Sequence, residues 1–321
     1  MPRGVVVPPS LVAVAARQLG LVSSAQCDDH GVADGPRTRL LRAGRWTRPT
    51  RGVYDTEPMS DHDRPPDDRR RRAAWLGMLA YGPRAIPVGA CALALHGVAG
   101  LPARIAPEIA LPGGSAVRPR DGIRVRHYDD FVTTRLGGRL VAAFDDALVQ
   151  ALPELRRTPA VAVLDNALNR GLVDDERLAV VRAAMRGRRG AAGVDAWWHL
   201  VDGRAESPLE SDARLRCIDA GIGPHELQVE VSDGAGRFLA RGDMGWRLRG
   251  GRWLLVEIDG REVHDAPSAL YADRTRQNRL LATGRIDLLR FTARDLGSYA
   301  AFIAPIRAHL AADAAADRRR A

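Results

Sequence analysis

Residues 253–260, with the sequence WLLVEIDG, constrain the fold of this chain more than any other segment. The stretch is apolar from Leu254 to Ile258 apart from Glu257, which is the pattern of a strand buried inside a sheet. A carboxylate in such a strand is costly to bury unless something pairs with it. Glu257 and Asp259 are two residues apart and therefore project from the same face of the strand. The segment predicts a sheet that carries carboxylates at one point.

Two further strands are predicted before this segment. Residues 226–231 and 237–240 alternate around a turn at 232–234, and the second run leads to Asp243. Asp243 can therefore reach the same point as Glu257. Converging carboxylates repel one another, and a hard divalent cation relieves that repulsion because it takes oxygen ligands. We expect Asp243 and Glu257 to bind Mg²⁺ or Mn²⁺, which can activate water and stabilise charge on a phosphodiester.

The same acidic residues can also be explained without a bound metal. They fit a surface hairpin whose carboxylates pair with arginines, or a carboxylate held by backbone caps. A helix predicted to start at Pro208 presents a similar choice, since Ser207 can cap it and Glu210 completes a capping box three residues on. Glu210 either only caps this helix or serves the site as an extra ligand or water-orienting group.

Three motifs, AESPLES, RGDMGW and VEIDGREVH, resemble the PD-(D/E)XK nuclease superfamily, and most closely its very-short-patch-repair-like branch. In that branch a strand ends in Asp-Gly and a histidine follows five residues after the Asp, as His264 follows Asp259. The resemblance implies a restriction-endonuclease-like α/β/α domain with Asp243 as a metal ligand and Glu257 or Asp259 beside it. It implies His264 as a general base or phosphate contact, a role that suits an imidazole. The superfamily's usual lysine is replaced by Asp259, and Gly242 stands where proline usually precedes the first Asp.

The segment YADRTRQNRLLATGRIDLLRFTARDL resembles the closing helix–strand–helix of the same branch. Arg274 and Gln277 are three residues apart on the expected helix and could contact the DNA backbone. A solvated amphipathic face explains these two residues nearly as well.

The first 58 residues predict a winged helix-turn-helix. Leu11, Ala15 and Leu19 form an apolar stripe on a first helix, and Ser23 or Ser24 can cap a second. We expect Asp34 to cap a third helix that runs from residue 36 to residue 43. Residues 46–49 and 52–54 then form a two-stranded wing.

Six arginines and no acidic residue lie between residues 35 and 54. They would place positive charge on the third helix and on the wing, where a winged helix meets DNA. A solvated basic face on a protein-interaction module is the alternative. The predicted DNA contacts are Arg37, Arg39, Arg42, Arg45, Arg48 and Arg51.

The stretches LGLVSSAQ and PRTRLLRAGRWTRPTRGVY resemble the N-terminal winged-helix domain of AbiEi-type antitoxins of type IV toxin–antitoxin systems. The resemblance implies that Arg37, Arg39, Arg42 and Arg48 bind operator DNA, and it raises a protein toxin as a partner. The stretch LAYGPRAIPVGACALALHGVAGLP resembles the central part of such regulators, which implies a spacer or regulatory role.

These patterns predict an α+β multidomain chain. A winged helix over 1–58 is followed by a charged, proline-rich linker over 59–72, where MSDHDRPPDDRRRR is nearly free of apolar residues. A mixed α/β middle region over 73–200, the nuclease-like domain over 201–312 and a tail over 313–321 complete the chain.

The charge balance favours a polyanionic partner. The chain has 48 basic and 39 acidic residues and no lysine, so its net charge of +9 comes from arginine, which binds phosphate bidentately. A GC-rich genome also replaces lysine by arginine. Three scattered cysteines and the lack of a long apolar run or an evident signal peptide predict a cytoplasmic protein without a membrane span.

Two functions fit these features. In the first, the winged helix holds DNA while the metal-dependent C-terminal domain, an Mg²⁺-dependent endodeoxyribonuclease, hydrolyses its phosphodiester bonds. In the second, the chain is a non-catalytic, antitoxin-like repressor whose nuclease fold is only a scaffold. An RNA-binding role is disfavoured because aromatic residues, which supply stacking platforms, make up only 5% of the chain. No pattern indicates an oligomeric state.

Overall fold

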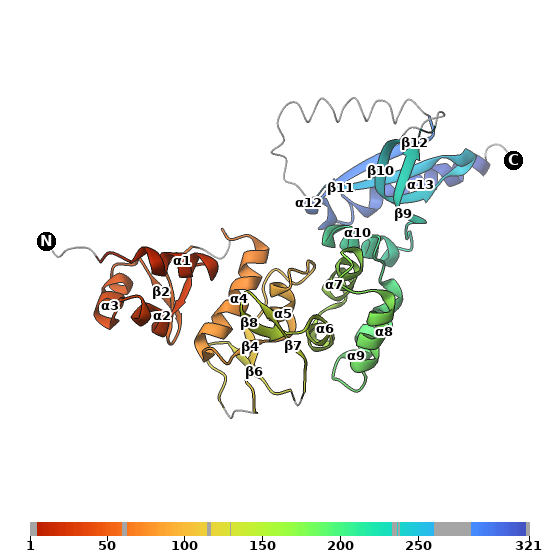
Figure 1. Ribbon diagram of the computed structural model, residues 1–321. Coiled ribbons are helices and arrows are strands. Elements are labelled where there is room, and N and C mark those ends of the chain that lie inside the picture. The colour runs from red at the N-terminus through yellow and green to blue at the C-terminus, as the bar shows by residue number, and fades with distance from the viewer. Residues whose placement is uncertain are drawn as a thin grey trace. The chain divides into compact units, whose positions relative to one another are not determined.

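The structure is a computed structural model, and it describes residues 5–59, 63–113, 117–128, 130–232, 236, 238–259 and 284–318. The chain, drawn from red at its N-terminus to blue at its C-terminus in Figure 1, divides into two compact units. The first unit comprises residues 1–160 and 174–196, and the second comprises 161–173 and 197–321. Within the described ranges, no helix is both long enough and apolar enough to cross a membrane.

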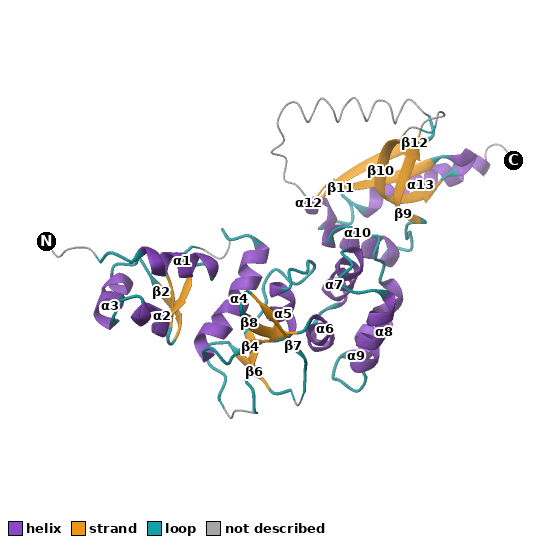
Figure 2. Cartoon of the chain, viewed as in Figure 1, coloured by secondary structure: helices purple, strands orange, loops and turns teal. Residues whose placement is uncertain are grey.

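The first unit begins with an N-terminal module of short helices and a small sheet, visible in Figure 2. Strand β1 pairs with β3, which pairs with β2, in a three-stranded antiparallel sheet. Leu11, Val22, Leu40 and Trp46 are buried together beneath the helices. The predicted helices and wing are present, and β1 is an addition that the sequence patterns did not indicate. The elements are α1 (Pro9–Arg17), β1 (Leu21–Ser23), α2 (Ser24–Asp29), α3 (Asp34–Arg42), β2 (Thr47–Thr50) and β3 (Val53–Asp55).

The helix starts differ in one respect from the expectation. Ser23 caps α2, because its hydroxyl accepts the Gln26 N–H and the Gln26 side chain accepts the Ser23 N–H. The predicted cap of α3 by Asp34 is wrong, since Ala33 occupies the N-cap and Asp34 lies in the first turn. A carboxylate there still opposes the positive end of the helix dipole.

The predicted linker differs from the structure over its second half. Helix α4 (Pro66–Tyr81) starts inside it and carries Arg72, which pairs with Asp55 and donates to the Leu19 carbonyl. Further along α4, Leu79 packs with Leu21 and Val53 of the N-terminal sheet. The charged residues before Ala73 therefore form helix, and Arg70 in the same helix donates to the Leu101 and Pro102 carbonyls.

The rest of the first unit contains a small sheet, a hairpin and several helices. The sheet has the order β4-β5-β6, and β7 pairs with β8 in the hairpin, which the sequence patterns missed. Residues 144–152, 160–168 and 174–185 have apolar residues at helical spacing, and helices form over these stretches to within a few residues. The elements are β4 (Ile86–Pro87), α5 (Gly89–Leu95), β5 (Glu108–Ala110), β6 (Arg124–Arg126), β7 (Thr133–Leu136), β8 (Arg139–Ala142), α6 (Phe144–Ala151), η1 (Leu152–Glu154), α7 (Arg157–Asn169), α8 (Asp175–Ala184) and α9 (Ala191–Trp197).

The second unit is built on a four-stranded mixed sheet with the order β12-β11-β10-β9. Strand β10 is antiparallel to both β9 and β11, whereas β12 runs parallel to β11. Side chains from α10, α12 and α13 join those of the sheet in one core that includes Cys217, Trp246 and Phe302. The elements are η2 (Trp198–Leu200), α10 (Pro208–Asp219), β9 (Glu226–Ser232), β10 (Phe238–Arg247), η3 (Arg249–Gly251), β11 (Trp253–Asp259), β12 (Ile286–Thr292), α12 (Ala293–Leu296) and α13 (Ile303–Arg318).

We expect two helical glycines of the first unit to respond oppositely to alanine. A Cβ on Gly77 of α4 would lie 2.8 Å from Ile109 Cγ2, closer than real Cβ contacts, whereas a Cβ on Gly35 of α3 would meet nothing within 4 Å. Gly77→Ala should therefore lower the free energy of unfolding by about 1–3 kcal/mol through overpacking. Gly35→Ala, the matched control, should leave it unchanged or raise it by about 0.5 kcal/mol through helix propensity. Thermal and urea unfolding measure both, and equal effects would contradict the packing of α4 on β5.

Candidate functional site

The first candidate site is the arginine surface, which we define as Arg39, Arg42, Arg45, Arg48 and Arg51. All five side chains are exposed, two on α3 and three on or beside the β2–β3 hairpin. Leu40 between the first two is buried, so α3 turns its apolar side inward and its charge outward. None of the five arginines forms an ion pair within the described part of the chain. The guanidinium groups of this surface can donate hydrogen bonds to phosphate oxygens without first breaking an ion pair to an acid of the same chain.

Arg37 does not belong to this surface. Its guanidinium lies 2.9 Å from Asp28, donates to the Ser24 carbonyl and covers the ring of Tyr54, and only 8% of its side chain is exposed. A buried guanidinium needs such acceptors, and α2 supplies two of them. Arg37 therefore holds α3 against α2, and its burial there replaces the exposed position that the predicted DNA contact requires.

The turn of the hairpin is held by residues that the sequence analysis did not single out. Thr50 donates its hydroxyl to Asp121 at 2.5 Å, and Arg120 donates to the Arg51 carbonyl at 3.4 Å. The hydrogen bond from Thr50 lowers the pKa of Asp121 below its usual value. The carboxylate of Asp121 thereby ties the hairpin to the turn that precedes β6.

The second candidate site is a carboxylate cluster on the sheet of the second unit. The β10–β11 register pairs Met244 with Val256, which sets Asp243 opposite Glu257. On the other side, the parallel β11–β12 register pairs Glu257 with Arg290. The sheet thus brings together the two acids that the sequence spacing singled out.

Asp243 is the electrostatically unusual member of this cluster. Burial raises the pKa of Asp243 to about 7, and the negative charges of Glu210 and Glu257 add to the rise. A hydrogen bond from the Ile258 N–H to Asp243 Oδ2, 2.7 Å long, acts in the opposite direction. No arginine forms an ion pair with Asp243 among the described residues, and the positive charge of Arg241 lowers its pKa only in part.

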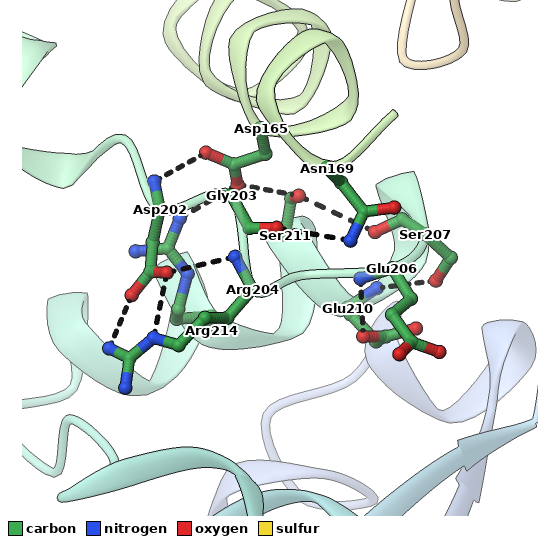
Figure 3. A network of polar contacts seen from close by, with 10 residues as sticks. All are labelled: Asp165, Asn169, Asp202, Gly203, Arg204, Glu206, Ser207, Glu210, Ser211 and Arg214. Carbon is green, nitrogen blue, oxygen red and sulfur yellow. Dashed lines mark hydrogen bonds and ion pairs between the residues drawn. The ribbon is translucent and has the colours of Figure 1, made fainter. Parts of the chain in front are cut away.

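Glu210 lies beside this cluster at the start of α10, where Figure 3 shows its surroundings. Ser207 accepts the Glu210 N–H at 3.2 Å, which confirms the predicted cap. The other half of the expected capping box falls elsewhere, since Glu210 Oε2 accepts the N–H of Glu206 at 2.9 Å and the side-chain amide of Gln228 at 2.8 Å. Burial raises the pKa of Glu210 above its usual value.

The other two acids have different surroundings. Glu257 Oε2 lies 2.8 Å from Arg290 Nε, a partner that the sequence analysis did not consider. Asp259 is exposed at the end of β11. The remaining predicted site residues, His264, Arg274 and Gln277, lie outside the residues that the structure describes.

The chemistry of the cluster fits a hard divalent cation at Asp243. Its oxygen donors are of the kind that Mg²⁺ prefers, and a cation there would relieve a buried carboxylate of two repelling neighbours. The geometry is less complete, because the described residues include no group of three or more His, Cys, Asp or Glu side chains arranged to hold a metal ion. Glu257 already has Arg290, so Asp243 with Glu210 is the better placed pair.

A buried network fixes the helix that carries Glu210 (Figure 3). Asp165 on α7 is 1% exposed and accepts hydrogen bonds from Ser211 at 2.7 Å and from Arg214 at 2.8 Å. The Asp202 N–H donates to its other oxygen at 2.7 Å. This network explains why residues 161–173 belong to the second unit and not to the predicted middle region. The one sequence signal was an acid inside the apolar run VAVLDNAL.

Comparison with known proteins bears on the N-terminal module. Residues 10–54 match the family described as transcriptional regulator, AbiEi antitoxin. The winged-helix elements and the arginine surface lie within or beside this match. The module is similar to a DNA-binding regulator domain.

Two curated relatives from Mycobacterium tuberculosis cover a larger part of the chain. They come from strains CDC 1551 / Oshkosh and ATCC 25618 / H37Rv, and both are called uncharacterized proteins. Each is 34% identical over 175 residues, which is 54% of this chain and 63% of the relative. The match therefore spans less than two thirds of the length of these relatives.

We expect Asp243→Asn to reduce the pH dependence of stability. Because the pKa of Asp243 rises from 3.8 to about 7 on folding, the folded protein keeps a proton that the unfolded chain releases between these values. The stability linked to that proton is complete below pH ~4 and is lost as the pH rises through ~7. Asparagine stays neutral, so the variant should be more stable than the wild type at pH ~8, by on the order of 2 kcal/mol.

Urea unfolding at acidic and alkaline pH, followed by tryptophan fluorescence, measures this difference. Glu230→Gln, which changes an exposed acid of β9, is the control and should follow the wild type at both pH values. A wild type and an Asp243→Asn variant with parallel pH profiles would show that burial does not perturb Asp243.

Proposed function

We propose that this chain is a DNA-binding regulator that contacts duplex DNA through the arginine surface of its N-terminal module. The observation that carries the proposal is the continuity of unpaired positive charge from α3 to the β2–β3 hairpin. The family match over residues 10–54 supports it, since that family is described as transcriptional regulators. The protein toxin raised by the same resemblance is a proposed partner of the whole chain.

The positions of the arginines in the module suggest that those on α3 and those on the hairpin contact different parts of the DNA. Helix α3 presents Arg39 and Arg42 from one exposed face, which suits a helix that enters the major groove. Arg48 and Arg51 on the hairpin suit contacts to phosphates beside that groove. Arg37 stays inside the module and keeps α3 in place.

Removal of Arg39 and Arg42 together should weaken DNA binding and its salt dependence. The slope of log affinity against log salt falls by about 0.9 for every phosphate that the protein no longer neutralises, because fewer counterions are released. We expect Arg39→Ala/Arg42→Ala to bind duplex DNA at least about tenfold more weakly at moderate salt, measured by fluorescence anisotropy over a salt series.

The matched control for this experiment removes the same charge from another surface. Arg104 and Arg156 are exposed arginines of the first unit outside the N-terminal module, and Arg104→Ala/Arg156→Ala should leave both affinity and salt slope close to the wild type. If both double variants lost the same DNA affinity, binding would depend only on the net charge of the protein. The arginine surface would then not be the binding site.

The carboxylate cluster favours a second candidate function, metal-dependent hydrolysis of phosphodiester bonds. The supporting observation is the raised pKa of Asp243 beside Glu210 and Glu257, in a sheet whose strands carry the motifs of the nuclease resemblance. When bound, a divalent cation would supply an activated water and charge neutralisation at the phosphate. In this proposal Asp243 and Glu210 hold the cation, the Ile258 N–H fixes the orientation of Asp243, and Arg290 holds Glu257 in the sheet.

Supercoiled plasmid incubated with Mg²⁺ or Mn²⁺ tests this second function. The wild type should nick or cut the plasmid, and Asp243→Asn should lower the rate by at least about a hundredfold because the cation loses a ligand. Glu230→Gln again serves as the folded control and should retain the wild-type rate. No cleavage with either metal, alongside intact DNA binding, would leave a non-catalytic regulator whose nuclease-like domain is a scaffold.

A further inference from the structure

A cavity of about 490 Å³ lies within the first unit, apart from both candidate sites. It is bounded by the end of strand β6, by helix α6 with η1, and by the loop between α8 and α9. Its volume falls in the range of pockets that bind small organic ligands. Nothing in the arginine surface or the carboxylate cluster makes use of it.

The side chains at this cavity carry an excess of positive charge. Arg126 is balanced, because it lies 3.0 Å from Glu108 and 2.5 Å from Glu154. Arg188 and Arg189 also line the cavity and are exposed, and neither forms an ion pair in the ranges that the structure covers. The positive charge of Arg188 acts to lower the pKa of Asp146, but the two groups lie farther apart than an ion pair. The Arg188 guanidinium lies 5.7 Å from the centroid of the Tyr128 ring, which does not neutralise its charge. Both guanidinium groups can therefore bind an anion from outside.

The loop that carries these two arginines is seated firmly on η1. Gly190 has a positive φ of 93°, and a Cβ at this position would lie 2.1 Å from the Pro153 carbonyl oxygen. The Arg188 N–H donates to the Met185 carbonyl at 3.0 Å, which closes the turn after α8. The backbone that carries both arginines is therefore held against η1, although their exposed side chains would still have to be ordered by a ligand.

A buried amide adds a neutral donor to the cavity wall. The side chain of Gln150 lines the cavity and is only 6% exposed. Its Oε1 accepts the Gly89 N–H at 2.9 Å, while its Nε2 donates no hydrogen bond within the described residues. Because Gln150 lines the cavity, its free amide N–H groups can donate to an oxygen of a bound molecule.

We propose that this cavity binds the phosphate group of a small phosphorylated molecule. Arg188 and Arg189 would hold phosphate oxygens through their planar forks, and Gln150 Nε2 would donate to a further ligand oxygen. The concave shape and limited volume suit a molecule of mononucleotide size or smaller better than a convex duplex. This site does not depend on the proposed DNA-binding function.

Isothermal titration calorimetry of the full chain tests the site with two separate probes, pyrophosphate and AMP. Saturable binding of both probes is expected if phosphate alone is recognised, and binding of AMP alone if the rest of a nucleotide is also required. Arg188→Ala/Arg189→Ala should weaken binding at least about tenfold, because it removes charge-assisted hydrogen bonds. Gln150→Glu keeps the acceptor for the Gly89 N–H but replaces the donor by a negative charge, so it should weaken binding to a similar extent.

Arg186→Ala is the matched control, since Arg186 is an exposed arginine before the same loop that does not line this cavity. It should retain wild-type affinity for either probe, and circular dichroism should show that all variants are folded. The proposal is overturned if neither probe binds at about 1 mM, the weak end of specific affinity. It is also overturned if Arg186→Ala loses as much affinity as Arg188→Ala/Arg189→Ala, or if only duplex DNA binds to these arginines.

Discussion

Buried arginine–carboxylate pairs hold together segments of this chain that lie far apart in the sequence. Arg72 reaches Asp55, Arg126 reaches Glu108 and Arg214 reaches Asp165, and each of these carboxylates is almost fully buried. A planar guanidinium satisfies both oxygens of a carboxylate and keeps its charge when buried, which an ammonium group does less well. In a chain without lysine, every such connection is made by arginine.

Two partly buried acids at the carboxylate cluster lack such a partner, whereas Glu257 beside them pairs with Arg290. Neither Asp243 nor Glu210 forms an ion pair with an arginine in the described part of the chain, and burial raises the pKa of both. An uncompensated buried carboxylate is destabilising, so a cation from solution would be a favourable partner. Asp165, by contrast, is held by Arg214 and belongs to the contacts that hold the fold.

Arginines divide in the same way between structure and surface. Arg37 and Arg72 are enclosed and hydrogen-bonded to backbone carbonyls, whereas Arg39 and Arg42 on α3 project into solvent. The Arg188–Arg189 pair forms a third class, exposed but presented by a backbone that Gly190 fixes against Pro153. Among the described arginines that pair with no internal acid are those of the arginine surface and the two at the cavity beside η1.

The sequence by itself determined the local elements and the local spacing of charge. Apolar periodicity located α1, and turn and cap residues located α2 and α10. Alternation located β9 and the start of β10, and a continuous apolar run located β11. It also placed Asp243 and Glu257 on adjacent strands, because that requires only a short hairpin. These features depend on contacts between residues a few positions apart.

Tertiary structure decided everything that depends on partners distant in the chain. Arg37 is buried beside Asp28 and Ser24, which lie on another helix and accept from its guanidinium. Residues 161–173 belong to the second unit, where Asp165 pairs with Arg214. The pairing of Glu257 with Arg290 follows from a parallel register that no local pattern encodes. The raised pKa of Asp243 likewise arises from burial and from Glu210 on a separate helix, because desolvation and charge are properties of the packed fold and not of the sequence around one residue.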